Sequence, residues 1–177
     1  KGVGIEGTAI LANLYYEQLS TQFGQSFVQK AQDFIALLSV VPEGKLALKH
    51  SPHCLHDATE GGLLGALWEV CAGQNLGFIV KELSVPLHPE TKTICDFFQI
   101  DPLKLISSGT LIIFTPHPDP LLENLQKESI PAFQIGTITD LKDKILVHAN
   151  GENEIIESCP QDELWRITEK STDVTSF

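Results

Sequence analysis

The sequence predicts an α+β fold built around a mixed sheet. Segments of helical and strand character interleave along most of the chain, and three strand-like segments follow one another near its end. Regular alternation throughout would favour a doubly wound parallel sheet. Consecutive late strands, the last two of them forming a hairpin, favour a layered α+β sheet instead.

The first third of the chain is expected to be helical. A glycine-rich loop at residues 1–7 leads into a helix whose expected N-cap is Thr8. Apolar residues at helical spacing predict a second helix over about 26–38. Pro42 interrupts this pattern, and residues 43–50 are expected to form a short third helix.

The middle of the chain alternates between strands and helices. An amphipathic helix is expected from Leu63 to about Gly73, followed by a strand that Pro86 closes. Residues 89–100 read as a helix with proline in its first turn. The apolar run at 110–115 is typical of a buried strand.

The last part of the chain is expected to be rich in strands. A helix from about Asp119 precedes strands at 132–139, 144–149 and 154–158, and turn residues at 149–151 join the last two. Residues 160–167 are expected to be helical or irregular. We expect one domain over residues 1–167 and a flexible tail over 168–177.

The composition fits a soluble globular domain and argues against two kinds of partner. Of the 177 residues, 42% are hydrophobic and 20% are charged. A net charge of −11 with Arg166 as the sole arginine argues against nucleic acid, which clustered basic side chains recognise. No apolar run is long enough to cross a bilayer, so we expect no membrane partner.

The first residue and the cysteines indicate what kind of protein the chain comes from. It begins with Lys1 rather than Met, so we expect a fragment or a processed product of a longer protein. Its four cysteines form no C-x-x-C pair, and we expect four reduced thiols in a cytoplasmic protein.

The first glycine motif resembles a dinucleotide-binding fingerprint only in part. Gly2, Gly4 and Gly7 spell G-x-G-x-x-G before a helix. A dinucleotide site also requires a second strand that ends in an acidic residue about 20 positions later. The segment that should hold this strand has helical periodicity, so the sequence argues against an NAD-binding enzyme.

The second glycine motif lies at a predicted helix start. Gly61 and Gly62 open the helix, although glycine costs about 1 kcal/mol relative to alanine at each helical position. Asp57 or Thr59 is the expected cap, and Asp57 with Glu60 resembles a capping box. Two explanations stay open: free amides at the helix start bind a phosphate or carboxylate, or the glycines permit close packing on a neighbouring strand.

Histidines and serines supply the other candidate site residues. His50, His53 and His56 are three residues apart, but Pro52 interrupts the segment, so we expect no metal site. His56 beside Asp57 is a candidate proton-handling pair, and the alternative is a histidine hydrogen-bonded in a loop. The turn at Ser107, Ser108 and Gly109 could bind phosphate oxygens or be an ordinary turn before a strand.

Four stretches together resemble a known superfamily. They are KGVGIEGTAIL (1–11), HDATEGGLLGALWEV (56–70), VPLHPETKTICDFFQIDPL (85–103) and ISSGTLII (106–113). Their order and spacing are similar to those of the C-terminal domain of the aminoimidazole ribonucleotide (AIR) synthase-related superfamily. The resemblance covers about residues 1–167, and the branch most similar is that of the hydrogenase maturation proteins.

The resemblance implies a fold, a cleft and a cofactor. It implies a three-layer α/β/α domain with partial likeness to a ferredoxin fold. It also implies an N-terminal domain of the same parent chain that binds ATP and magnesium and commonly dimerises. No cofactor is expected in this fragment itself. His56 and Asp57 are expected to line the cleft between the domains as catalytic groups. The residues expected to contact the substrate or its phosphate there are Gly7, Thr8, Thr59, Glu60, Gly61, Gly62, Ser107, Ser108 and Gly109.

Two differences from the hydrogenase maturation proteins bear on the reaction. Those proteins end in a reactive cysteine, whereas this chain ends at Phe177 and Cys159 lies too early. Position 60 is Glu where those proteins commonly have Arg. The sequence therefore fits either a shortened chain or a different reaction. We expect an ATP-dependent synthetase, kinase or dehydratase of which this fragment alone is inactive, or alternatively a non-catalytic module for interaction or dimerisation. In either case we expect a homo-oligomer.

Overall fold

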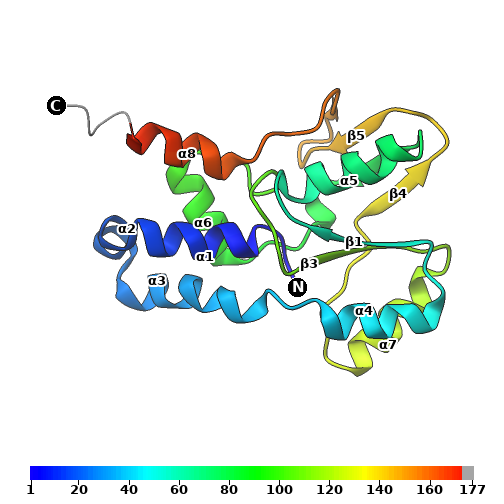
Figure 1. Cartoon of the computed structure of the whole chain (residues 1–177), viewed down its shortest axis with the longest axis horizontal. Helices are drawn as coiled ribbons and strands as arrows, with labels where there is room; N and C mark the ends of the chain where they lie inside the picture. The colour runs from blue at the N-terminus through cyan, green and yellow to red at the C-terminus, as the bar shows by residue number, and fades with distance from the viewer. Residues whose placement is uncertain (173–177) are drawn as a thin grey trace.

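The computed structural model describes residues 1–172, and it combines two small sheets with eight α-helices in that range (Figure 1). The helices are α1 (Ile5–Leu14), α2 (Tyr16–Phe23), α3 (Gln25–Gln32), α4 (Val41–Ala47), α5 (Gly62–Gly73), α6 (Pro89–Phe98), α7 (Pro118–Lys127) and α8 (Glu163–Thr172). The strands are β1 (Cys54–Ala58), β2 (Gly77–Lys81), β3 (Thr110–Phe114), β4 (Gly136–Thr139), β5 (Lys144–Val147) and β6 (Asn153–Ile155). Short 3₁₀ helices cover Asp33–Leu37, Leu48–His50 and Glu82–Ser84.

The strands divide into two sheets. β1 and β3 form an antiparallel pair that runs from Cys54 opposite Phe114 to Ala58 opposite Thr110. The other sheet has the order β4-β2-β5-β6, in which β2 and β5 are parallel and the other pairs are antiparallel. The predicted α+β class, the mixed sheet and the late β5–β6 hairpin are confirmed.

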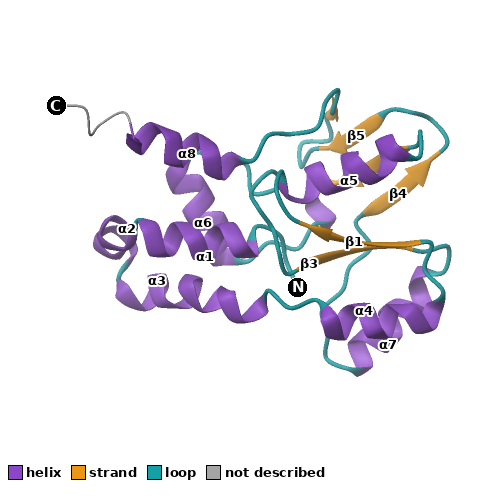
Figure 2. Cartoon of the chain, viewed as in Figure 1, coloured by secondary structure: helices purple, strands orange, loops and turns teal. Residues whose placement is uncertain are grey.

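The helices form two groups around the sheets (Figures 1 and 2). α5 packs on β1 and β2, and α4 packs on β3 and on α7, so the β1–β3 pair has helices on both faces. α1, α2, α3 and α6 pack together beside the sheets, with α8 next to them. The two groups meet where α1 begins.

α5 is apolar except for the exposed Glu69, because most of its residues are buried. Leu63, Leu64 and Leu67 are buried together with Phe78 of β2 and Ile112 of β3 in one core cluster. A helix that is hydrophobic all round is expected in such a central position. The helical group has its own core, in which aromatic rings of α2, α3 and α6 contact one another.

The strand β1 was not predicted. Pro52 made the segment look irregular, but it lies two residues before the strand and takes no part in its ladder. The backbone N–H of His53 even donates to the carbonyl of Phe114 (2.8 Å). Cys, His and Asp are weak strand formers, so the pairing with the apolar β3 determines this conformation.

The predicted helix caps at the glycine motifs are wrong. α1 begins after Gly4, and Thr8 lies inside the helix with its hydroxyl against the carbonyl of Gly4 (2.6 Å). α5 begins after Gly61, and Asp57 belongs to β1, so Asp57 and Glu60 form no capping box. In both helices a left-handed glycine replaces the expected polar cap.

The C-terminal helix is longer than expected. α8 continues to Thr172, past the predicted domain end at residue 167. The remainder of the predicted tail, 173–177, lies outside the described residues. The four cysteines are free, and Cys71 and Cys95 are buried.

Candidate functional site

Three segments that are distant in the sequence meet at the start of α1. They are the glycine loop at 2–8, the end of β1 with the following turn, and the turn at 106–110 before β3. The amide of Gly7 donates to the carbonyl of Ile106 (3.0 Å), and the amide of Ser107 donates to the carbonyl of Thr59 (3.3 Å). The structure thus brings the three sequence motifs to one place.

Buried hydroxyl groups hold this junction together. The hydroxyl of Thr110 donates to the carbonyl of Gly2 (2.6 Å) and lies 2.8 Å from that of Ser107. Because Thr110 has one hydroxyl hydrogen, Ser107 must be the donor in this pair. The oxygen of Ser107 also accepts from the amide of Gly4 (2.7 Å). Ser107 is therefore fully engaged within the protein.

Gly7 and Thr8 are also buried. The hydroxyl of Thr8 is buried against Gly4 and Thr91, whose hydroxyl lies 2.8 Å away. A Cβ at Gly7 would lie 2.3 Å from Cγ of Leu105, so only glycine allows α1 to approach this leucine. Both residues support the junction from inside and offer no surface to a ligand.

The glycine pair before α5 is explained by close packing. Gly61 and Gly62 have φ values of 75° and 64°, and a Cβ at Gly62 would lie 2.6 Å from the carbonyl oxygen of Leu103. The amide of Gly62 donates to Thr59 (3.1 Å), and that of Leu64 donates to Leu103 (3.0 Å). These amides have partners within the chain.

A carboxylate of this same chain occupies the start of α5. Oδ2 of Asp162 accepts from the amide of Gly61 (2.7 Å), and Oδ1 accepts from the amide of Leu164 (2.8 Å). Asp162 is only 7% exposed. A helix start favours an anion, and here the carboxylate of Asp162 is that anion. The sequence analysis did not predict Asp162 as a site residue.

The accessible part of the junction carries two carboxylates, those of the exposed Asp57 and the half-buried Glu6, which we call the acidic pair. Oε2 of Glu6 accepts from the amide of Ser108 (3.3 Å). Partial burial and the charge of Glu6 raise the pKa of Asp57, while His56, Lys1 and the Gly109 amide act in the opposite direction. A carboxylate with raised pKa holds a proton more readily.

Glu6 was missed by the sequence reasoning. It occupies the first turn of α1, where an acidic side chain is common because it interacts well with the helix dipole. Its position directly after the glycine loop was the available signal. Only the fold places it beside a residue that is 51 positions away.

His56 does not pair with Asp57. Neighbouring residues of a strand point to opposite faces, and Nε2 of His56 lies 3.6 Å from a carboxylate oxygen of Glu69 on α5. Thr59 and Glu60 are exposed in the turn between β1 and α5. Of the predicted site residues, Asp57 is accessible as a member of the acidic pair, and Thr59, Glu60 and Ser108 are accessible near it.

Two negative findings apply to the described residues. Between residues 1 and 172, no three His, Cys, Asp or Glu side chains gather in a manner suited to a metal ion. Within the same range, no helix has the length and apolar character needed to cross a membrane.

Curated relatives of this chain are hydrogenase maturation proteins. A carbamoyl dehydratase HypE of Rhodobacter capsulatus is 36% identical over 63 residues, which are 36% of this chain and 18% of that protein. The hydrogenase expression/formation protein HupE of Azotobacter chroococcum is 31% identical over 107 residues, covering 58% of this chain and 29% of that protein.

Solved structures with the same fold include hydrogenase maturation protein HypE. One such structure has 27% identity and a TM-score of 0.59, covering 67% of this chain and 41% of that one. Another, solved in complex with ATP, has 25% identity and a TM-score of 0.56, covering 64% and 37%. This chain therefore spans less than half the length of the proteins that it matches.

The family comparison covers most of the chain. The model described as "AIR synthase related protein, C-terminal domain" matches residues 1–149 of the 177. This range contains all three motifs that meet at the start of α1, as well as both sheets except β6. The chain belongs to the AIR synthase-related family, and it is the C-terminal domain of that family that it matches.

Proposed function

We propose that this chain is the C-terminal half of an ATP-dependent enzyme that activates an oxygen of its substrate by phosphoryl transfer. An N-terminal domain of the same parent chain would bind ATP and magnesium and supply the phosphoryl group. Membership of the family supports this reading, and so does the ATP complex of a HypE protein with the same fold. The parent is expected to act in the cytoplasm.

The described residues fit the substrate side of such a site better than the nucleotide side. A triphosphate has no place at the start of α5, because Asp162 already accepts from the amide there. The accessible surface near it presents the carboxylates of the half-buried Glu6 and the exposed Asp57. Carboxylates repel phosphate groups but accept protons and hydrogen bonds from hydroxyl and amide groups.

Asp57 is the residue we assign to proton transfer. Its raised pKa gives it greater proton affinity than an ordinary carboxylate, which suits a general base. The charge of Glu6 raises its proton affinity further, whereas the backbone of Gly109 lowers it. The location of this carboxylate, at the meeting point of three motifs, is the observation that carries the proposal.

The other predicted residues take supporting roles in this proposal. Thr59, Glu60 and Ser108 form the exposed rim that contacts the substrate. His56 positions β1 through its pair with Glu69. Five buried residues hold the acidic pair in place from below: Gly7, Thr8, Gly61, Gly62 and Ser107.

The test uses the longer protein that contains this chain. Asp57→Asn keeps the shape of the side chain and removes the base, so kcat for ATP-dependent turnover should fall by about 10²–10⁴-fold with the KM for ATP unchanged. Asp140→Asn, in the exposed turn before β5, is the matched control and should retain wild-type turnover. Wild-type kcat in Asp57→Asn would refute the role assigned to Asp57.

A homo-oligomerisation module is a second candidate, favoured by an apolar groove beside Glu6. The groove has a volume of about 250 Å³ and is lined by Ile10, Leu14, Ile35 and Leu38. Leu14 and Ile35 are 60% and 66% exposed, and exposed apolar patches mark interaction sites. Ile35→Lys should convert dimers to monomers in sedimentation velocity, whereas Leu141→Lys, at a 70% exposed position in a turn, should not.

A further inference from the structure

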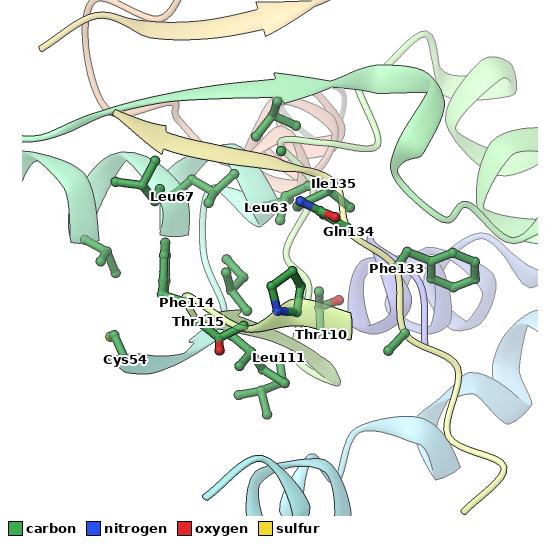
Figure 3. Close-up of a pocket in the computed structure, with 18 of the residues that line it drawn as sticks. Cys54, Leu63, Leu67, Thr110, Leu111, Phe114, Thr115, Phe133, Gln134 and Ile135 are labelled. Atoms are coloured by element: carbon green, nitrogen blue, oxygen red, sulfur yellow. The ribbon is translucent and has the colours of Figure 1, made fainter. Parts of the chain in front are cut away.

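The large apolar cavity between the two sheets has charged groups that are already paired. Its volume is about 1100 Å³, and Phe114 is among the residues that line it (Figure 3). The carboxylate of Glu43, on its wall, pairs with the side chain of Lys1 (2.9 Å). That of Glu69 lies 3.6 Å from His56. The carboxylates of this cavity therefore have partners within the chain.

The smaller apolar groove beside Glu6 has an acidic end without such a partner. It lies between α1 and the 3₁₀ helix Asp33–Leu37, and Glu6, Ile10 and Leu14 line it at helical spacing. From Glu6 to Leu14, α1 rises by about 12 Å. Within residues 1–172, no ion pair includes Glu6. The groove therefore fits an apolar surface that carries a cationic side chain.

An exposed face of α4 has the complementary pattern. Val41 and Leu48 are 56% and 66% exposed, and Lys45 is exposed between them. Spacings of four and three residues place the three side chains on one face, which we call the α4 face. Its length, from Val41 to Leu48, is about 10 Å and is similar to that of the groove. In the described part of the chain, Lys45 also belongs to no ion pair.

We propose that two copies of this chain form a dimer in which the α4 face of each copy lies in the groove of the other, with Lys45 paired with Glu6 of the second copy. This inference rests on the second candidate function above, homo-oligomerisation through the groove. Leu38, which lines the groove, is only three positions before Val41, so the two surfaces adjoin. A two-fold contact uses such adjoining surfaces twice, because each copy supplies both of them.

The second copy would contribute a charged group to the candidate site. Glu6 is a member of the acidic pair, and its charge acts on Asp57. Lys45 of the second copy, held on Glu6, would bring a positive charge next to this pair. The contact would also cover the exposed apolar side chains of both surfaces, and such side chains mark interaction sites when they form a patch.

The test is sedimentation velocity of the 177-residue chain over a series of protein concentrations. Glu6→Lys and Lys45→Glu should each raise the dissociation constant of the dimer at least about tenfold, because each places like charges opposite one another. The double variant with both changes restores opposite charges and should return the constant to within about threefold of wild type. Lys142→Glu, in the exposed turn before β5, is the matched control and should leave the constant unchanged.

A pair of apolar variants tests the α4 face without a change of charge. Leu48→Ser should weaken the dimer, because it removes an apolar side chain from the contact. Leu83→Ser, at a 79% exposed position outside both surfaces, should not. Both leucines are exposed, so neither change removes a side chain from the core.

Three results would overturn the proposal. They are a wild-type chain that stays monomeric at every concentration, a double charge variant no tighter than the single variants, and an unchanged constant in Leu48→Ser. If Ile35→Lys gives monomers while Lys45→Glu and Leu48→Ser keep the wild-type constant, homo-oligomerisation through the groove stands and the α4 face is not its occupant. None of these measurements involves ATP, so they are independent of the Asp57 test.

Discussion

The carboxylate of Asp162 lies 2.7 Å from the backbone nitrogen of Gly61, although the two residues are 101 positions apart. Its other oxygen accepts from Leu164 at the beginning of α8. One buried acid thus binds the amide of Gly61, the residue that precedes α5, and also the first turn of the C-terminal helix. The carboxylate of Asp162 therefore occupies the position in which a phosphate or carboxylate ligand was expected at the start of α5.

Replacement of Asp162 should reduce stability. Asp162→Asn keeps one acceptor oxygen and removes the charge, so we expect a loss of about 1–2 kcal/mol in the free energy of unfolding. Urea denaturation followed by circular dichroism measures it. Asp140→Asn, at an exposed position, should change the same quantity by less than about 0.5 kcal/mol. Equal stability of Asp162→Asn and wild type would show that the cap contributes nothing.

Gly62→Ala should be strongly destabilising. Its φ of 64° disfavours alanine, and the new Cβ would lie 2.6 Å from a carbonyl oxygen. Backbone strain should lower the free energy of unfolding by about 1–2 kcal/mol, and overpacking should lower it by about 1–3 kcal/mol more.

Two other glycines separate these two contributions. Gly24 has a φ of 87° with nothing within 4 Å, so Gly24→Ala should show the backbone strain alone. Gly73 ends α5 with open space around it, so Gly73→Ala should stabilise by up to about 1 kcal/mol. A loss at Gly62 no larger than that at Gly24 would contradict the packing explanation.

The four thiols should react in an order set by their burial. Burial and nearby acidic groups raise the pKa of Cys95 to about 12, so its thiolate is scarce at pH 8. Burial also raises the pKa of Cys71, and partial burial with the charge of Glu69 raises that of Cys159, but the Cys159 thiol is exposed to the reagent whereas Cys71 is buried. Iodoacetamide labelling followed by mass spectrometry should modify Cys159 first and Cys95 last. All four should react equally in urea, and early labelling of Cys95 in the folded protein would contradict the buried core.

The carboxylate of Asp57 should titrate above its ordinary value of 3.8. A raised folded-state pKa means that the folded protein binds the proton more tightly than the unfolded chain. This contribution therefore favours folding at low pH and is lost as the pH rises from 3.8 through the raised pKa. Asp57→Asn should accordingly leave stability unchanged well below pH 3.8 and increase it above that window.

A carbon-detected NMR titration tests the cause of this shift. Glu6→Gln should lower the pKa of Asp57, because the charge of Glu6 raises it. Glu123→Gln, on the exposed surface of α7, should leave it unchanged. An unaltered titration of Asp57 in Glu6→Gln would place the cause of the shift elsewhere.

Local patterns predicted most of the helices and strands. The apolar run at Thr110–Phe114 and the proline-led helix Pro89–Phe98 stand where spacing and turn residues indicated. β1 could not be predicted in this way, because its residues are weak strand formers and its partner is β3. The two helix caps failed for a related reason: the sequence offered polar candidates, but close packing required glycine.

The candidate site was predictable only in its components. The resemblance pointed to Asp57 and to the turn at Ser107–Gly109, and the structure brings both to the start of α1. Glu6 and Asp162 were missed because their partners lie about 50 and 101 positions away in the sequence. The burial of Ser107 and Thr8 likewise depends on contacts that no local pattern reports.

The buried hydroxyl groups of Ser107 and Thr110 join segments from distant parts of the chain. The hydrogen bonds from Gly4 to Ser107 and from Thr110 to Gly2 span 103 and 108 positions. Closing such long loops costs conformational entropy that local contacts do not cost. The arrangement that gives Asp57 its proton affinity is therefore present only when these distant segments are packed together.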